Sequence, residues 1–397
     1  MKRAAAALEA ALSRLAQRQL RRQRTTVEAF TAADSRVVAL AGGRELVDFS
    51  SNDYLGLARH PALAAAMSAC AARAGAGSGA SHLVTGHGAE HERLEEELAA
   101  FTGRERALLF STGYMANLAV MSALAGRGER VLLDRLSHAS LIDGALLSGA
   151  LLRRYGHADA QAAALLGSDG APTALIATDG VFSMDGDLAP LPELARAARA
   201  QHAWLVVDDA HGLGVVGASG RGTLEHFGLG AEEVPVLVGT LGKAFGSFGA
   251  FVAGGADLIE YLIQTARTYI YTTALPQPVA AATRRALALA QAESWRRERV
   301  LALTARFRRH ASEAQVPLSD SGTPIQPVVL GSAAAALAAQ AQLQEAGLWV
   351  VAIRPPTVPQ GSARLRVTLS AAHTEAQVDE LVAQLARSCA RARSCEA

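Results

Sequence analysis

Cysteine, net charge and long apolar runs are scarce in this chain of 397 residues, and each scarcity excludes a class of protein. The three cysteines, Cys70, Cys389 and Cys395, are odd in number and widely spaced, which fits neither a disulfide framework nor a zinc site. A formal net charge of +1 provides no overall field that would attract nucleic acid or an anionic membrane. We therefore expect a protein of the cytoplasm, a reducing compartment, that binds neither nucleic acid nor a membrane and holds no metal ion.

The first residues do not predict an export signal. Met1–Leu12 starts with basic residues and an alanine run, but its apolar stretch is short and Glu9 interrupts it. We expect neither a secretory signal nor a membrane span there. The arginines between Arg14 and Arg24 leave an organelle transit peptide open as an alternative, although the leucine spacing fits an ordinary amphipathic helix. These leucines are Leu8, Leu12, Leu15 and Leu20.

The middle of the chain has the pattern of an α/β domain. Hydrophobic residues make up 50% of the sequence, enough for a large core in two or three structural lobes. From residue 106 to about 254, short apolar runs alternate with helical segments, which predicts a mostly parallel sheet covered by helices on both faces. The expected strands are 107–110, 131–133, 150–152, 173–177, 204–207, 236–238 and 250–253.

The two ends of the chain have different patterns. Residues 1–48 predict a helix followed by a hairpin with its turn at 41–44. From Pro276 onward we expect one long helix, strands at 326–330, 348–353 and 364–368, a helix at 333–345 and a final helix. The predicted division is an N-terminal helix and hairpin segment (1–48), a large α/β domain (49–275) and a smaller α+β C-terminal domain (276–397).

A glycine-spaced turn between two of the expected strands carries Lys243. Ligands of parallel sheets bind beyond the carboxyl ends of the strands, so polar residues there are candidates for the functional site. Burial lowers the pKa of an ammonium group, and a neutral amine can condense with an aldehyde such as that of pyridoxal phosphate. Taken alone, Lys243 is more often a surface-loop lysine.

Asp208 and His211 favour a cofactor role for Lys243 over a place in a surface loop. A carboxylate at a strand end can keep a pyridine nitrogen protonated, and an imidazole three residues later can bond the phenolic oxygen of the same ring. Asp208 by itself is more often a cap. Together with Lys243 about thirty-five residues later, the two residues form the arrangement that a pyridoxal-phosphate enzyme requires.

Other strand ends carry weaker candidates, each with a structural alternative. Ser111–Tyr114 opens a helix whose free N–H groups suit a phosphate, or else Ser111 or Thr112 caps the helix. His138 could stack on an aromatic ring or cap the next helix. The polar run Thr178–Asp187 could line a site or form a turn. Gly212–Gly217 matches the dinucleotide fingerprint of a non-catalytic Rossmann protein, but residues 218–222 do not continue as the required helix.

Five motifs make the chain similar to the α-oxoamine synthases, a pyridoxal-phosphate family. The resemblance runs from about Leu20 to the last helix. It implies the aspartate-aminotransferase fold, fold type I, and a homodimer with shared active sites. The motifs are Phe49–Leu57, Asp134–Leu141, Gly180–Asp187, Val207–Gly212 and Ala352–Pro359.

The resemblance implies a role for each candidate residue. Lys243 would bind the cofactor covalently, Asp208 would pair with its ring nitrogen, His211 with its ring oxygen, and His138 would stack on the ring. The remaining cofactor contacts would be Gly113, Tyr114, Ser183, Thr240, Tyr271 and Thr273, of which Tyr271 and Thr273 would reach across the dimer interface. The residues implied to contact substrate are Asn52 and Arg354 at the amino-acid carboxylate, with Thr357, Arg21 and His138.

The motif at residues 352–359 favours particular substrates within the family. It resembles the members of biotin biosynthesis, which condense L-alanine with a pimeloyl thioester carried by coenzyme A or an acyl carrier protein. The alternatives are members of the glycine C-acetyltransferase, 5-aminolevulinate synthase and serine palmitoyltransferase types. Asp179 stands where the family often has glutamate, and several arginines, Arg21, Arg22 and Arg24, compete as partner of the acyl carboxylate.

Overall fold

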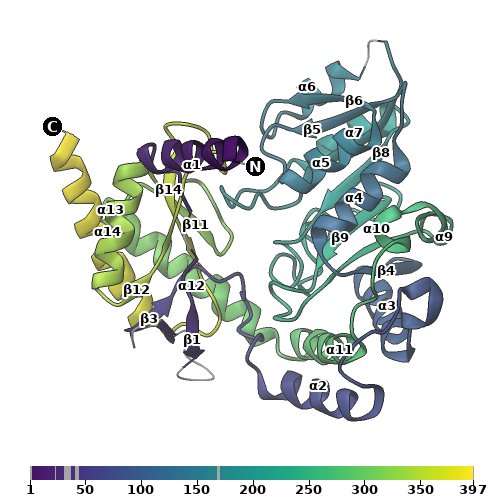
Figure 1. The fold of residues 1–397 in the computed structure, drawn as a ribbon, viewed down its shortest axis with the longest axis horizontal. Coiled ribbons are helices and arrows are strands. Elements are labelled where there is room, and N and C mark those ends of the chain that lie inside the picture. Colours follow the sequence, from purple (N-terminus) through teal and green to yellow (C-terminus); the bar gives the residue numbers. More distant parts are fainter. Residues whose placement is uncertain (1, 23, 31–36, 41–43, 168–169, 397) are drawn as a thin grey trace. The chain divides into compact units, whose positions relative to one another are not determined.

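The computed structural model describes residues 2–22, 24–30, 37–40, 44–167 and 170–396. The chain forms two compact units (Figure 1). The larger unit contains Asn52–Ser183 and Asp187–Glu298, and the smaller contains Met1–Ser51, Met184–Gly186 and Arg299–Ala397. Whether 1–48, 49–275 and 276–397 behave as separate domains stays a prediction.

A seven-stranded sheet forms the centre of the larger unit. Its order is β4 (Arg106–Phe110), β10 (Ala250–Gly254), β9 (Val236–Thr240), β8 (Trp204–Asp208), β7 (Thr173–Asp179), β5 (Arg130–Asp134) and β6 (Leu151–Tyr155). Only β10 runs antiparallel to its neighbours, β4 and β9, among these strands. The predicted mostly parallel sheet is therefore confirmed.

Helices cover both faces of this sheet (Figure 1). Side chains alternate between the faces along each strand, so Val131 and Leu133 join one core while Leu132 joins the other. The first core includes residues of α4 (Gly113–Leu124), α5 (Ala139–Ser148), α9 (Ala256–Thr265) and α10 (Arg267–Ile270). The second includes residues of α6 (Ala160–Leu166), α7 (Leu191–Ala200) and α8 (Thr223–Phe227). Burial on both faces explains why the strands read as continuous apolar runs.

The long helix expected after Pro276 is wrong in one respect, because it is two helices. α11 (Gln277–Ala292) ends at Glu293, whose backbone leaves the helical region (φ −108°, ψ 64°). α12 (Ser294–Glu313) starts directly afterwards. α11 packs against α2 (Pro61–Ala74) and α3 (Ala89–Thr102), and Arg284 joins it to α3 through ion pairs with Glu90 and Glu97 at 2.7 and 2.6 Å. The π-helical turn η1 (His82–Gly86) precedes α3.

The smaller unit contains two sheets. One has the order β1 (Val27–Phe30), β2 (Val37–Leu40), β3 (Arg44–Asp48), β12 (Leu348–Trp349), and the other has β11 (Ile325–Gly331), β14 (Ala363–Thr368), β13 (Val351–Ile353). The helices of this unit are α1 (Lys2–Gln17), α12, α13 (Ala333–Glu345) and α14 (Glu375–Glu396). The hairpin of β2 and β3 is confirmed, while residues 41–43 of its predicted turn lie outside the described residues.

The single strand expected at 348–353 is also wrong. The chain leaves one sheet after Trp349 and enters the other at Val351. Ser50 stabilises this crossing, because its hydroxyl donates to the Trp349 carbonyl at 3.2 Å and accepts the Val351 N–H at 2.9 Å. The contact joins residues about three hundred positions apart, so local sequence could not reveal it.

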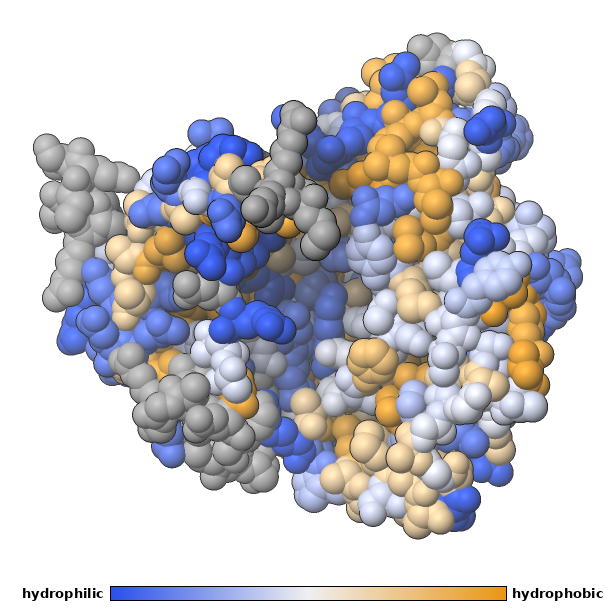
Figure 2. Space-filling view, in the orientation of Figure 1, coloured by the Kyte–Doolittle hydropathy of each residue, from blue (hydrophilic) through white to orange (hydrophobic). Residues whose placement is uncertain are grey.

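Two features concern the surface: the length and polarity of the helices, and one area of apolar side chains. Among the described residues, every helix is too short or too polar to cross a membrane. Figure 2 shows apolar side chains gathered over the part of the larger unit that carries α5, β6 and α6. Leu146, Leu151 and Leu165 are exposed there.

Candidate active site

Lys243 lies in a tight turn between β9 and β10, with its side chain half-buried. Three backbone hydrogen bonds of 2.8–2.9 Å hold the turn, including Gly246 N–H to the Lys243 carbonyl. Gly246 has a φ of 61°, and a Cβ at this position would lie 2.3 Å from the Ala58 nitrogen. Only glycine fits that close approach, so the glycine spacing fixes where the lysine points.

The Lys243 ammonium group belongs to a chain of polar contacts. Its Nζ lies 2.9 Å from Nε2 of His211, and Nδ1 of the same imidazole lies 2.7 Å from the hydroxyl of Tyr54. That hydroxyl is also 3.3 Å from Oδ1 of Asn52. Three residues of the larger unit, two of them near its start, are thus brought together with the predicted covalent lysine.

Asp208 ends β8 as predicted and is buried, and its carboxylate is held on both oxygens. The Ala210 N–H donates to Oδ1 at 3.0 Å, and the Asn117 amide donates to Oδ2 at 2.6 Å. Asn117 also donates to Ser140 Oγ at 2.8 Å, while its own Oδ1 is buried and has no hydrogen-bond partner among the residues that the structure describes. These bonds fix the orientation of the Asp208 carboxylate.

His138 is the N-cap of α5, which confirms its structural alternative, and its role at the cofactor stays a prediction. Its side chain accepts the Ser140 N–H, and its Nδ1 lies 2.7 Å from the Ser140 hydroxyl. Burial lowers the pKa of His138, the charge of Asp208 opposes this shift, and the charge of Lys243 adds to it. The imidazole therefore interacts electrostatically with both of the other predicted catalytic residues.

Asp179, at the end of β7, supports this arrangement from the next strand. It is buried, and its Oδ2 accepts the His138 backbone N–H at 2.9 Å. Burial and the nearby charge of Asp208 raise the pKa of Asp179 well above its ordinary value, and the bond from His138 partly offsets the shift. The shorter aspartate, where the family often has glutamate, thus reaches the backbone of the loop that carries His138.

The predicted phosphate residues lie at the ends of two elements. Gly113 and Tyr114 begin α4, whose cap Thr112 accepts the Met115 N–H at 3.2 Å. A Cβ at Gly113 would meet nothing within 4 Å, so open space lies beside this helix terminus. Tyr114 is exposed and its hydroxyl donates to Asp143. Thr240 ends β9 and donates to the Gly249 carbonyl at 3.2 Å.

Tyr271 and Thr273 follow α10, and both are exposed in the single chain. Tyr271 is 70% exposed, and its described aromatic contact is with the guanidinium of Arg267 at 4.9 Å from the ring centroid. The larger unit therefore does not bring these two residues into the polar group around Lys243. Ser183 lies in a turn of the same unit and is half-buried.

The predicted substrate arginine and threonine form a separate group in the smaller unit. Arg354, which follows β13, donates to the Gln19 carbonyl. Thr357 Oγ1 accepts a hydrogen bond of 2.9 Å from Arg22, and both Arg21 and Arg22 are exposed. Among the N-terminal arginines, Arg22 is thus the described partner of Thr357.

Gly212 of the apparent dinucleotide fingerprint and Gly222, five residues after its end, have a packing role. A Cβ at Gly212 or at Gly222 would lie 2.1 or 1.9 Å from a carboxylate oxygen of Asp209. This buried carboxylate accepts the Thr223 N–H at 2.7 Å and so closes the loop. α8 begins only at Thr223, which confirms that no dinucleotide-binding helix follows Gly217 directly.

Sequence reasoning missed three supporting residues and one strong signal. Tyr54 and Ser140 stand within recognised motifs but received no role, and Asn117 is a buried polar residue in an otherwise mostly apolar helix. The missed signal is composition, because Lys2 and Lys243 are the only lysines among 38 basic residues. A chain that otherwise uses arginine keeps a lysine in the glycine turn, where an amine with an adjustable pKa is useful.

Known proteins resemble the chain over most of its length. The family described as aminotransferase class I and II matches residues 44–385. An 8-amino-7-oxononanoate synthase of Methylococcus capsulatus is 63% identical over 95% of this chain and 96% of its own length. One of Thioalkalivibrio sulfidiphilus is also 63% identical, over 87% of this chain and 89% of its own.

Solved structures agree with these sequence matches. A serine palmitoyltransferase variant of S. paucimobilis with bound PLP–myriocin aldimine has a TM-score of 0.91 and 29% identity, covering 98% of both chains. The crystal structure of 8-amino-7-oxononanoate synthase from Francisella tularensis has a TM-score of 0.77 and 33% identity, covering 86% of this chain and 97% of that one. The predicted fold type I architecture is thereby confirmed.

Proposed function

We infer the function from a family membership: the chain belongs to the class I and II aminotransferases and, within them, to the 8-amino-7-oxononanoate synthases. It is a pyridoxal-phosphate-dependent acyltransferase that condenses L-alanine with a pimeloyl thioester. The products are 8-amino-7-oxononanoate, carbon dioxide and a free thiol, in a step of biotin biosynthesis. The observation that carries this proposal is the placement of Lys243 beside His211, with the oriented Asp208 carboxylate in the same unit.

The residues of the larger unit fit the three polar parts of pyridoxal phosphate. Lys243 would hold the aldehyde carbon, His211 the phenolic oxygen and Asp208 the ring nitrogen, with His138 against the ring face. The open N-terminus of α4 at Gly113 and Tyr114 would bind the phosphate together with Thr240, and Ser183 would complete the contacts. The buried Asn117 Oδ1, which lacks a hydrogen-bond partner in the described part of the chain, is a further polar atom of the residue that bonds Asp208.

When bound, pyridoxal phosphate supplies an electron sink for the charge that develops at Cα of alanine. Asp208 keeps the ring nitrogen protonated, because a nearby carboxylate favours the cationic form. Once the alanine amino group has replaced it at the aldehyde carbon, Lys243 Nζ would be free to take the proton from Cα, and the adjacent His211 imidazole would fix the direction of the amine. Loss of carbon dioxide after acyl transfer leaves a carbon that the same amine can reprotonate.

The family resemblance assigns Asn52 and Arg354 to the alanine carboxylate. Arg354 suits this role, since a guanidinium group pairs with a carboxylate through two parallel hydrogen bonds. Thr357, with Arg21 or Arg22, contacts the pimeloyl chain and its far carboxylate. The thioester is carried by coenzyme A or by an acyl carrier protein.

We also propose that two copies of the chain form a homodimer with shared active sites in the cytoplasm. Tyr271 and Thr273 would complete the cofactor site of the partner, which is consistent with their exposure in one chain. Size-exclusion chromatography with light scattering distinguishes a dimer from a monomer.

One assay tests the proposed substrates against those of related enzymes. Purified protein with pyridoxal phosphate receives alanine, glycine or serine, each with pimeloyl, acetyl or palmitoyl thioesters, and products are identified by mass spectrometry. We expect alanine with a pimeloyl thioester to be fastest, on coenzyme A or on carrier protein. Faster turnover of glycine with acetyl-CoA, or of serine with palmitoyl-CoA, would overturn the substrate assignment.

A further inference from the structure

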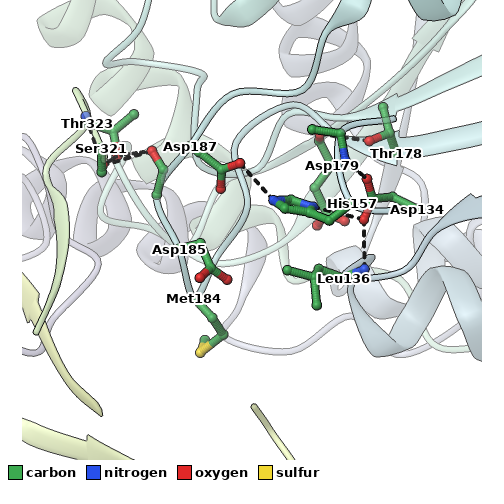
Figure 3. Close-up of polar contacts among 12 residues, drawn as sticks. Asp134, Leu136, His157, Thr178, Asp179, Met184, Asp185, Asp187, Ser321 and Thr323 are labelled. Atoms are coloured by element: carbon green, nitrogen blue, oxygen red, sulfur yellow. Dashed lines mark hydrogen bonds and ion pairs between the residues drawn. The ribbon is translucent and has the colours of Figure 1, made fainter. Parts of the chain in front are cut away.

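His157 follows β6 and contacts two carboxylates that come from different parts of the larger unit (Figure 3). Its Nδ1 lies 3.0 Å from Oδ1 of Asp134, and its Nε2 lies 2.8 Å from Oδ2 of Asp187. The ring also stands edge-on to Phe182, with centroids 4.4 Å apart and planes at 83°. His157 lies outside every motif that led to the candidate site.

The two contacts require a positively charged imidazole. A neutral imidazole donates from one nitrogen only, whereas each carboxylate here needs a donor. Burial alone would lower the pKa of His157, but the hydrogen bonds to Asp134 and Asp187 outweigh it and raise the pKa to about 10. The ring is therefore a cation at neutral pH, with each nitrogen donating to one carboxylate.

The first carboxylate fixes the loop that leads to His138. Asp134 ends β5 and is buried, and it accepts the N–H groups of Leu136 and Ala158, each at 2.7 Å. The loop then reaches His138, whose N–H is bonded to Asp179. Asp134 thus holds the start of this loop and Asp179 holds its end.

The second carboxylate fixes the turn that contains Ser183. This turn is closed by a bridge between Val181 and Leu188 and by the Phe182 N–H, which donates to the Asp187 carbonyl at 3.0 Å. His157 touches both arms, the ring of Phe182 on one and the carboxylate of Asp187 on the other. It therefore ties the turn to β5, while Arg364 pairs with Asp185 and two hydroxyls donate to the Gly186 carbonyl in the same turn.

We propose that His157 is a positioning residue: through Asp134 and Asp187, its cation holds together the two segments that present His138 and Ser183 to the cofactor. The inference rests on the proposed function for the roles of those two residues. Without the cation, the two carboxylates lose the partner that they share, and Asp134 keeps only its two backbone N–H donors, which favours separation of the segments.

The test compares His157→Gln with a matched control, His226→Gln, in protein loaded with pyridoxal phosphate. The control ring also stands edge-on to a phenylalanine, Phe227, at 4.8 Å and 80°, and none of the described ion pairs includes it. Hydrogen exchange is followed in peptides covering residues 135–140 and 180–188, together with the cofactor absorbance spectrum, kcat and KM. Glutamine cannot carry the charge but keeps a similar size and a donor.

For His157→Gln we expect exchange in both segments to accelerate at least about threefold. We expect kcat/KM to fall at least about tenfold, chiefly through kcat, because small misplacements of catalytic groups slow the reaction strongly. The absorbance spectrum should shift as well. His226→Gln should match the wild type in all four measurements.

A second variant keeps the test decisive if His157→Gln folds poorly. Asp187→Asn removes one carboxylate only, so exchange should accelerate in residues 180–188 and remain unchanged in 135–140. Wild-type exchange in both segments for both variants, with an unchanged spectrum, would overturn the proposal. If the wild type lacks condensation activity, the proposed function fails, whereas exchange and absorbance still decide the role of His157.

Discussion

The polar group around Lys243 and the group around Arg354 differ in how firmly the fold holds them. In the larger unit, Asp208 is buried at a strand end and bonded on both oxygens, and His211 is fixed between two neighbours. In the smaller unit, Arg354 and Thr357 follow a short strand and contact the exposed segment 19–22. The difference implies that the proposed cofactor residues are preformed, whereas the proposed substrate residues of the smaller unit have fewer constraints.

The largest effect is expected for Lys243→Ala, which removes the central side chain of the polar group in the larger unit. We expect turnover to fall by about 10⁴-fold or more, since general acid–base catalysis at Cα is lost along with the covalent hold on the cofactor. Borohydride reduction followed by peptide mass spectrometry should find the pyridoxyl group on Lys243 in the wild type and on no peptide of the variant. Lys2, the other lysine, is the internal control, and an adduct there instead would contradict the assignment.

Arg354→Ala tests the less constrained group. Loss of a charge-assisted pair with the alanine carboxylate should raise the KM for alanine about 10- to 100-fold, with a smaller effect on kcat. Arg364→Ala gives a contrast within the same unit, because that arginine is buried and pairs with Asp185, so it should affect stability more than KM. An unchanged alanine KM in Arg354→Ala would remove Arg354 from the substrate site.

A similar contrast, between local patterns and contacts of distant residues, explains which parts of the fold and of the site could be predicted from the sequence. Strands buried on both faces, such as β5 and β8, gave unmistakable apolar runs, and the residues at their carboxyl ends were correctly expected at one edge of the sheet. The predictions failed where a distant residue decides the conformation, as Ser50 does at the crossing after Trp349. His157 was missed for the same reason, since its two carboxylate partners are 23 and 30 positions away.

The free energy of unfolding, measured at several pH values, tests whether His157 of the larger unit is charged. Its pKa is raised from an ordinary 6.5 to about 10, so the protonated ring stabilises the folded state. That contribution is complete below pH 6.5 and is lost as pH rises from 6.5 toward 10. The difference in unfolding free energy between wild type and His157→Gln should therefore be about 1–2 kcal/mol near pH 6 and shrink toward pH 10. Urea titrations at several pH values measure it, and a difference that grows with pH would contradict a charged imidazole.

The smallest expected effect separates two neighbouring arginines of the smaller unit. Arg22 donates to Thr357 at 2.9 Å, whereas Arg21 is exposed and none of the described side-chain hydrogen bonds includes it. If the observed contact persists with substrate bound, Arg22→Ala should raise the KM for the pimeloyl thioester about three- to tenfold, which corresponds to one exposed hydrogen bond or ion pair. Arg21→Ala is then the matched control and should change it less than twofold. The reverse result would mean that substrate binding exchanges the two arginines, and it would show that this segment, unlike the turn of Lys243, is rearranged by its ligand.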